Sequence, residues 1–216
     1  MVNIYYAWNK REWNQRQWNS ISNELNEDIL ARGRRYHQWR DAQFYITGRL
    51  LLAKIFNRPV NQLHFSYNNN GRPCLRDEYD FNISHSGELL VCAICSKGGI
   101  GIDIEKIDDI SVDDFRAVLL DEEWNAITSS GEWAVQHFFE YWTKKEAALK
   151  AYGTGLSLPL TDVRITSDKA LIKDTIWYLK PAYLSPSYSC HLAMEINQPI
   201  SNVYDLTSFV DQYIHQ

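Results

Sequence analysis

The 216-residue sequence lacks long apolar runs, a surplus of basic residues and an abundance of cysteine. No apolar stretch approaches the roughly 20 residues needed to cross a membrane, so we expect no membrane association. The first ten residues hold no long apolar segment, which argues against a secretory signal and makes the cytoplasm the expected location. With 22 basic and 27 acidic residues, the net charge of −5 argues against a nucleic-acid-binding protein.

The four cysteines do not form a recognisable metal site. Cys92 and Cys95 make a C-x-x-C pair, but no second pair or nearby histidine completes a zinc set. The pair falls in the apolar run 89–95, which is typical of a strand, where residues three apart point to opposite faces. We therefore predict reduced, buried thiols.

The remaining composition is that of a folded, soluble domain. Apolar residues make up 45% and charged residues 23%, and no repeat, low-complexity tract or Pro/Ser-rich linker interrupts the chain. The clearest change comes near residues 105–110, where a strand pattern gives way to acidic sequence. We predict an N-terminal half of residues 1–105 and a C-terminal half of residues 106–216.

Hydrophobic patterning and turn residues predict the main elements. The expected helices span about 37–56, ended by Asn57-Arg-Pro59, and 133–152, ended by Gly153. The expected strands span 2–8, 62–67, 80–83, 89–96 and 99–105, with a turn at 68–71 and a strand-rich region from 161 to 216.

Charge is distributed unevenly along the chain. Residues 31–58 carry seven basic side chains and one acid, whereas residues 103–123 carry nine acids and two bases. The first segment can attract an anion and the second a cation. The planar guanidinium group of arginine binds phosphate well through paired hydrogen bonds. Arg72, in the rigid turn Gly71-Arg72-Pro73, is a further candidate for binding phosphate. A solvated charged face is the simpler alternative for any single arginine.

Two carboxylates alternate with isoleucines in the segment 100–105. On a strand, Ile100, Ile102 and Ile104 share one face, and Gly101, Asp103 and Glu105 share the other. The carboxylates then stand ~6.6 Å apart along the chain. Oxygen ligands at this spacing suit Mg²⁺, and Gly101 leaves room on the same face. A solvated strand face is the alternative, and the pair alone does not decide between them.

Glu146 interrupts an apolar stripe on the predicted helix 133–152. The stripe consists of Val135, Phe139, Trp142 and Leu149. An unpaired charge on this side costs several kcal/mol, so Glu146 needs a partner. Either a bound metal ion or Lys150, at the favourable i+4 spacing, supplies one. We favour a metal-binding or catalytic role for Glu146.

The polar segment 84–87, Ser-His-Ser-Gly, follows a predicted strand. It offers hydroxyls, an imidazole and a free backbone, so it suits an anion cradle, with a plain turn as the alternative. No G-x-S-x-G elbow marks a nucleophilic serine.

These blocks, in this order, resemble the 4′-phosphopantetheinyl transferases, specifically the long, monomeric type that activates nonribosomal peptide synthetases. The resemblance rests on Gly71-Arg-Pro73, Phe81-Asn-Ile-Ser-His-Ser86, Gly101-Ile-Asp-Ile-Glu105, and Trp142-Thr-Lys-Lys-Glu-Ala147 with Lys150 and Gly153-Thr-Gly-Leu156. It covers roughly residues 30–160. It implies an α/β (α+β) fold with two similar halves related by a pseudo-twofold axis, each a small sheet packed with helices, and an active site between them.

The resemblance also implies a set of site residues. Asp103, Glu105 and Glu146 would hold Mg²⁺ on the pyrophosphate of coenzyme A. Further coenzyme A contacts are expected from Ser84, His85, Arg72 at the nucleotide end, Lys150 at the pyrophosphate, Arg35 and Lys145. The family usually carries Arg or Thr early in the long first helix, where this chain has Phe44 and Tyr45, so individual adenosine contacts are not assigned.

The implied activity is transfer of 4′-phosphopantetheine from coenzyme A to a serine of an acyl or peptidyl carrier protein, releasing adenosine 3′,5′-bisphosphate. Glu146, or water positioned by it, is the candidate base, and Lys150 the group that stabilises or protonates the leaving phosphate. Two alternatives stay open: a Mg²⁺-dependent nucleotide phosphohydrolase, and a non-catalytic module that binds coenzyme A or a carrier protein.

Overall fold

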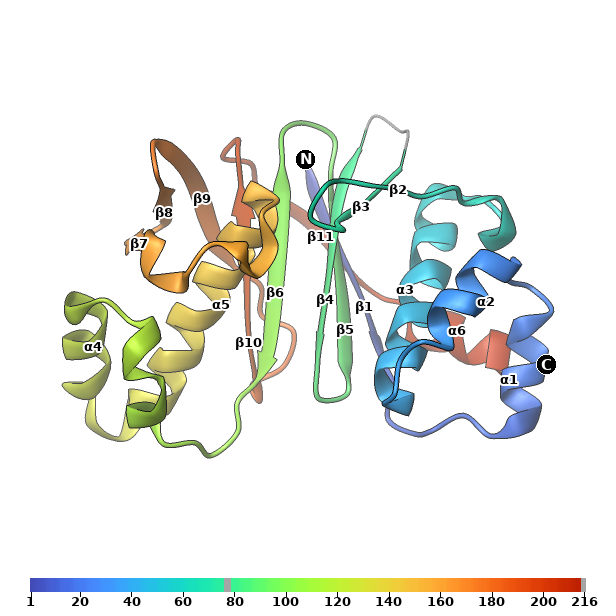
Figure 1. Ribbon diagram of the computed structural model, residues 1–216, viewed down its shortest axis with the longest axis horizontal. Coiled ribbons are helices and arrows are strands. Elements are labelled where there is room, and N and C mark those ends of the chain that lie inside the picture. The colour runs from blue at the N-terminus through green and yellow to red at the C-terminus, as the bar shows by residue number, and fades with distance from the viewer. Residues whose placement is uncertain (76–78, 215–216) are drawn as a thin grey trace.

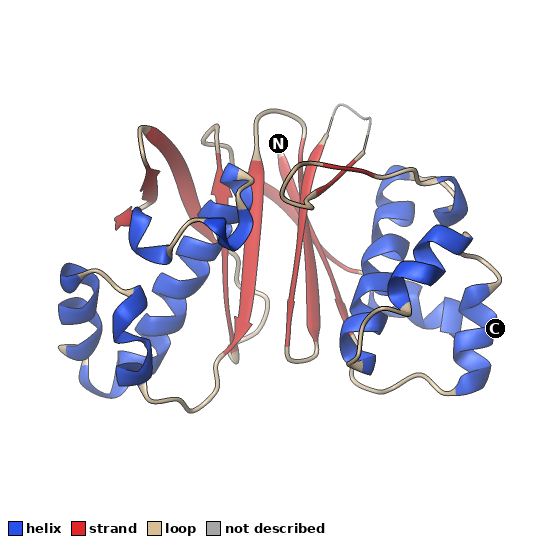
Figure 2. Ribbon diagram, in the orientation of Figure 1, coloured by secondary structure: helices blue, strands red, loops and turns tan. Residues whose placement is uncertain are grey.

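In the computed structural model, which describes residues 1–75 and 79–214, the chain forms two lobes that meet along a central seam (Figure 1). Each lobe has a sheet on the inside and helices on the outside, so the sheets lie in the middle and the helices at both ends (Figure 2). The strand order is β11-β1-β5-β4 in the first sheet and β6-β10-β9-β8-β7 in the second. This mixed α/β architecture confirms the predicted fold class.

The first lobe contains most of the N-terminal half. Its strands are β1 (Val2–Trp8), β4 (Asp80–Ser86), β5 (Leu89–Cys95) and β11 (Ile200–Asp205), with the small hairpin β2 (Ser66–Tyr67) and β3 (Pro73–Cys74). Its helices are α1 (Gln15–Ser22), α2 (Glu27–Gly33), α3 (Trp39–Phe56) and α6 (Thr207–Ile214), and a short 3-10 helix covers Val60–Gln62. The predicted strand 62–67 is wrong, because only its last two residues pair.

The second lobe contains the remaining elements. Its strands are β6 (Ile100–Lys106), β7 (Val163–Thr166), β8 (Lys169–Ile172), β9 (Thr175–Pro181) and β10 (Tyr188–Met194). Its helices are α4 (Asp121–Thr128) and α5 (Ala134–Tyr152), with 3-10 helices at Val112–Val118, Gly131–Trp133, Gly155–Ser157 and Leu160–Asp162. The predicted helix 133–152 therefore exists as α5, and it ends at Gly153 in the left-handed conformation.

The two sheets divide the chain earlier than the sequence suggests. β5 belongs to the first sheet, whereas β6 pairs antiparallel with β10 of the second. The division therefore falls within residues 96–99, and the predicted boundary at 105 would cut β6 away from its neighbours. In addition, β11 returns from the second half of the chain to pair with β1.

Apolar layers pack the sheets against the helices within each lobe and join the two lobes to each other. One lies between the first sheet and its helices, and includes Phe44, Leu50 and Phe81. A second lies between the sheets, where Val91 and Ile4 meet the three isoleucines of β6. A third packs α5 on the second sheet. Burial at roughly 25 cal/mol per Å² of apolar surface makes these layers the main stabilising contribution.

The cysteine prediction is confirmed. All four thiols are free, and three of them are buried. Cys92 faces the helical layer and Cys95 the layer between the sheets, as expected for residues three apart on a strand. Within the described ranges, no helix has the length and apolar character needed to span a bilayer.

Candidate active site at the lobe seam

The seam between β4 and β6 is closed by side chains rather than by strand pairing. Alternate polar side chains of β4 accept hydrogen bonds from backbone N–H groups of β6, the edge strand of its sheet. The pairs are Asp80 with Ile100 (2.8 Å), Asn82 with Ile102 (3.0 Å), Ser84 with Ile104 (3.4 Å) and Ser86 with Lys106 (3.0 Å). This ladder satisfies backbone donors that would otherwise be orphaned in the interior.

β4 extends further than predicted. It runs to Ser86 rather than stopping at Ile83, so Ser84 and His85 lie on a strand and not in a loop cradle. Their side chains point to opposite sides of the strand. Ser84 faces β6, whereas the ring of His85 stacks on Phe44 of α3 with centroids 4.6 Å apart.

Helix α5 lies directly on β6 because Gly101 has no side chain. A Cβ at this position would lie 2.5 Å from the backbone nitrogen of Ala151, and closer still to the carbonyl oxygen of Ala147. The room that Gly101 leaves is therefore occupied by the helix backbone. This close approach places Glu146 and Lys150 beside the polar face of β6.

Asp103 is the centre of the polar cluster on this face. It is 3% exposed, and its Oδ1 accepts hydrogen bonds from Lys150 Nζ at 2.6 Å and from Ser84 Oγ at 2.9 Å. Lys150 Nζ also donates to Ser84 Oγ at 2.8 Å. The second oxygen, Asp103 Oδ2, is buried and has no partner. A buried carboxylate oxygen left without a donor is costly, which makes it a natural ligand for a cation.

The two other carboxylates complete an acidic cluster with Asp103. Glu105 accepts a hydrogen bond from Ser86 Oγ at 2.7 Å, and its pKa is raised by burial and then by the charge of Asp103. Burial, followed by the charges of Asp103 and Glu105, raises the pKa of Glu146 to about 7 despite the opposing effect of Lys150. Among the described residues Lys150 forms its ion pair with Asp103, and not with Glu146 as in the simpler i+4 alternative to a metal-binding or catalytic role.

The donor chemistry of this cluster fits a hard divalent cation. All its ligand atoms are carboxylate oxygens, the type Mg²⁺ prefers, and Asp103 Oδ2 is unsatisfied. Across residues 1–75 and 79–214, however, no three His, Cys, Asp or Glu side chains are already gathered closely enough to hold a metal ion. The three carboxylates are therefore present at the seam, but they are not yet close enough to one another to coordinate one ion together.

His85 borders the same cluster. Part of its surface is exposed, but packing against the protein lowers its pKa, and the charge of Lys150 adds to this, while Asp41 and Asp103 oppose it. A neutral imidazole at physiological pH offers one donor and one acceptor nitrogen.

The structure places three further residues of the predicted set, of which Lys145 differs from expectation. Lys145 is a correction: it is 1% exposed, and its Nζ lies 2.6 Å from Glu123 of α4 and donates to the carbonyl of Leu160 at 3.0 Å. It therefore points away from the seam. The hydroxyl of Ser84 is already shared by Asp103, Lys150 and Ile104. Arg35 lies exposed just after α2, with no side-chain partner within the described ranges.

Arg72 is engaged by acceptors of the protein itself. Its side chain is 14% exposed, and both terminal nitrogens donate to protein acceptors, among them Asp80 and the carbonyl of Lys150. Its contact with a nucleotide stays a prediction.

Two groups of site residues were missed by the sequence analysis. Ser86 orients Glu105, and the alternation of polar residues at 80, 82, 84 and 86 was the available signal. On the inner side of α5, Thr143 Oγ1 lies 2.8 Å from His191 Nδ1 and 2.9 Å from Ser189 Oγ. This buried contact secures α5 against β10, and no local pattern connects residues so far apart in the chain.

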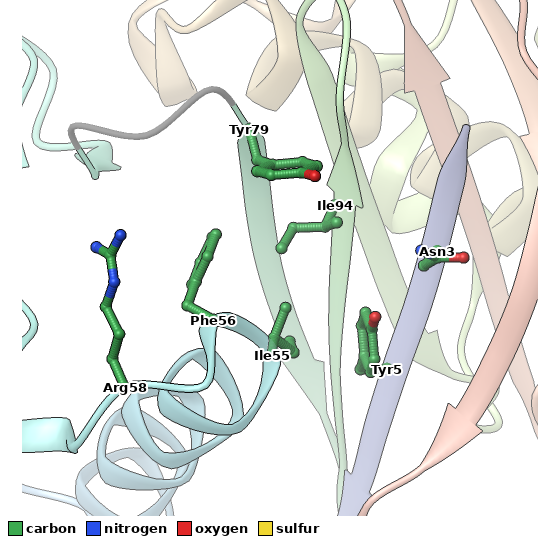
Figure 3. Close-up of a pocket in the computed structure, with 7 residues that line it drawn as sticks. All are labelled: Asn3, Tyr5, Ile55, Phe56, Arg58, Tyr79 and Ile94. Carbon is green, nitrogen blue, oxygen red and sulfur yellow. The ribbon is translucent and has the colours of Figure 1, made fainter.

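A separate cavity of about 440 Å³ lies on the far side of the first sheet, where α3 ends (Figure 3). Its walls include Tyr5, Phe56 and Tyr79. None of the predicted site residues lines this cavity.

Comparison with known proteins points to one family along most of the chain. Residues 8–97 match the family described as "4′-phosphopantetheinyl transferase, N-terminal", and residues 99–203 match the "4′-phosphopantetheinyl transferase superfamily". The break between these matches coincides with the division between the sheets.

Individual curated proteins similar to this chain carry the same family name. The chain is 30% identical over 174 residues to the 4′-phosphopantetheinyl transferase gsp of Aneurinibacillus migulanus, covering 78% of this chain and 73% of that protein. It is 34% identical over 165 residues to the 4′-phosphopantetheinyl transferase Sfp of Bacillus subtilis, covering 68% and 73%. It is also 32% identical over 151 residues to the 4′-phosphopantetheinyl transferase HetI of a Nostoc species, covering 63% of each.

Proposed function

The chain belongs to the 4′-phosphopantetheinyl transferase superfamily, and we propose that it uses the cluster at the lobe seam to transfer 4′-phosphopantetheine from coenzyme A to a serine of a carrier protein. The reaction releases adenosine 3′,5′-bisphosphate and depends on Mg²⁺. The observation that carries the site assignment is the buried, unsatisfied oxygen of Asp103, a carboxylate whose other oxygen contacts Lys150 and whose charge acts on Glu105 and Glu146.

Asp103, Glu105 and Glu146 would hold the Mg²⁺ ion. When bound, the ion neutralises pyrophosphate charge and stabilises the charge that develops during transfer. The raised pKa values of Glu105 and Glu146 support this assignment, because each reflects first the burial of the carboxylate and then neighbouring negative charge, both of which a bound cation would offset.

The side chains of this chain then supply positioning and proton transfer. The hydroxyl oxygen of the carrier serine attacks the β-phosphorus of coenzyme A, and the bond to the phosphate of the leaving nucleotide breaks. Glu146, or a water molecule that it positions, accepts the serine proton. Lys150 stabilises or protonates the leaving phosphate. No nucleophile of the enzyme is required in this step, because phosphoryl transfer needs mainly positioning and charge stabilisation.

His85 and Arg35 would contact coenzyme A phosphates from the first lobe. His85 stacks against Phe44 beside the acidic cluster, which orients its ring for such a contact. The enzyme is proposed to act as a cytoplasmic monomer. The carrier serine would approach along the seam, because that is where Glu146 lies.

The test is mass spectrometry of an apo carrier protein incubated with coenzyme A and Mg²⁺. We expect the wild-type enzyme to add one phosphopantetheine group, and Glu146→Gln to lower the rate by at least about 10²-fold. Glu140→Gln, on the same helix but lining a different cavity, is the matched control and should retain full activity.

Each rival function gives a distinct result. Release of nucleotide from coenzyme A without any carrier indicates the phosphohydrolase. Unchanged binding of coenzyme A by Glu146→Gln, with no turnover by either protein, indicates the binding module. If the enzyme modifies none of the carriers in a panel from fatty acid, polyketide and nonribosomal peptide systems, the proposal is contradicted.

A further inference from the structure

The C-terminal end of α5 is held by side chains of the other lobe. The last carbonyl groups of a helix have no partner within it. Here Arg72 Nη1 donates to the carbonyls of Lys150 at 2.9 Å and Ala151 at 3.4 Å. The amides of Asn70 and Asn68 donate to the carbonyl of Gly153 at 2.7 and 3.3 Å. Three side chains of the first lobe thus cap a helix of the second.

The second terminal nitrogen of Arg72 fastens the same guanidinium to both strands of the seam. Arg72 Nη2 donates to Asp80 Oδ2 at 2.7 Å and to the carbonyls of Ile100 at 2.8 Å and Phe81 at 3.1 Å. Asp80 Oδ2 also accepts from the backbone nitrogen of Ile100. The guanidinium therefore joins α5, β4 and β6 at one point. Its positive charge is also favourable at the negative end of the helix dipole.

The turn that presents these side chains is held by hydrogen bonds of its own, independent of the helix. Asn68 Oδ1 accepts from the backbone nitrogens of Asn70 at 3.0 Å and Arg72 at 2.9 Å, and Gly71 adopts a φ of +80°. Such an Asx turn fixes its own backbone. The donors consequently need little reorganisation to hold α5.

We propose that Asn68, Asn70 and Arg72, here named the α5 clamp, are positioning residues for phosphopantetheine transfer. Arg72 of the clamp donates to the carbonyl of Lys150, and the Nζ of the same lysine contacts Asp103 at 2.6 Å. The clamp therefore fixes the rotation of α5 about its axis and its distance from β6, and with them the positions of Lys150 and Glu146. This inference rests on the proposed function. It gives Arg72 a role in catalysis through α5 rather than through contact with the nucleotide.

The two roles for Arg72 separate in steady-state kinetics. A positioning residue that acts on the reacting groups alters kcat, whereas loss of a uniform binding contact raises KM. We expect Arg72→Gln to lower kcat by at least about 10-fold, because displacements of an ångström cost roughly 10²-fold, and to leave the KM for coenzyme A within about 2-fold. Arg72→Lys should recover part of kcat, since one ammonium group reaches fewer of the acceptors than the planar fork does.

Asn70→Ala is the milder variant in case Arg72→Gln does not fold. It should lower kcat in the same direction. Asn69→Ala is the matched control, because Asn69 lies exposed in the same turn and makes no side-chain hydrogen bond within the described ranges. It should behave as wild type.

Amide hydrogen exchange gives a readout that does not require turnover. Residues 147–153 should exchange faster in Arg72→Gln and Asn70→Ala than in wild type or Asn69→Ala. A raised KM for coenzyme A with unchanged kcat overturns the clamp in favour of a nucleotide contact, and unchanged exchange with unchanged kcat overturns it outright. If the wild-type enzyme modifies no carrier, the proposed function fails, and the exchange rates alone decide whether the clamp exists.

Discussion

The contact between α5 and β6 makes Gly101→Ala the most informative single substitution. The added methyl group would lie 2.5 Å from Ala151 N, and real Cβ contacts under 3.0 Å essentially never occur. The helix must therefore retreat from the strand by at least about half an ångström, against backbone atoms that cannot rotate away. Overpacking of this kind costs about 1–3 kcal/mol of stability. Because a misplacement of about 1 Å costs roughly 10²-fold in rate, we expect transfer activity to fall by about 10- to 100-fold.

Urea unfolding and the carrier-modification assay, run on the same preparations, check this prediction. The matched control is Gly48→Ala in α3, where the nearest atom to the added methyl is the side-chain end of Ile83 at 3.3 Å. That control should keep its activity and change stability by no more than about 1 kcal/mol. A Gly101→Ala enzyme with wild-type kcat and stability would refute the claim that close helix packing positions Glu146 and Lys150.

Three further predictions follow from buried polar groups. Lys145→Met leaves the 1%-exposed carboxylate of Glu123 without its cation and should lower the free energy of unfolding in urea by about 3–5 kcal/mol. The double variant Lys145→Met/Glu123→Leu should recover most of that stability, and equal losses in the single and double variants would contradict the prediction. Burial lowers the pKa of His191 from 6.5 to about 3, so its neutral form contributes folding stability above pH 6.5 that is lost as the pH falls toward 3. Between pH 7 and 5, the free energy of unfolding of His191→Asn should therefore fall by about 2 kcal/mol less than that of the wild type. Equal falls in the two proteins would refute the assignment. Ser86→Ala removes the hydroxyl that orients Glu105 and should raise the Mg²⁺ concentration required for half-maximal transfer by about 10- to 100-fold, and an unchanged Mg²⁺ titration would contradict it.

Short-range periodicity was sufficient to predict which faces of their elements the three carboxylates of the candidate site occupy. Alternation along the strand placed Asp103 and Glu105 opposite the three isoleucines, and the helical stripe placed Glu146 toward the seam. These relations depend on neighbours a few residues apart, which a sequence displays directly. The interruption of an apolar stripe by Glu146 was informative for the same reason.

Long-range pairing was not accessible in this way. That β6 pairs with β10, some ninety residues later, is invisible to local patterns, and the predicted boundary at 105 consequently missed the division between the sheets. Lys145 was misplaced because its partner Glu123 belongs to another helix. The short helices α1 and α2 were not predicted, since they are largely polar and owe their start to the caps Asn14 and Asn26.

The parallel pairing of β11 with β1 has a consequence for how the protein folds during synthesis. β1 leaves the ribosome well before its outer neighbour β11, because nearly the whole of both sheets lies between them in the sequence. Until residues 200–205 emerge, one edge of β1 presents bare amide and carbonyl groups to the cell. Closure of the first sheet therefore awaits completion of the second, and any pause late in translation prolongs exposure of an edge that invites misassociation.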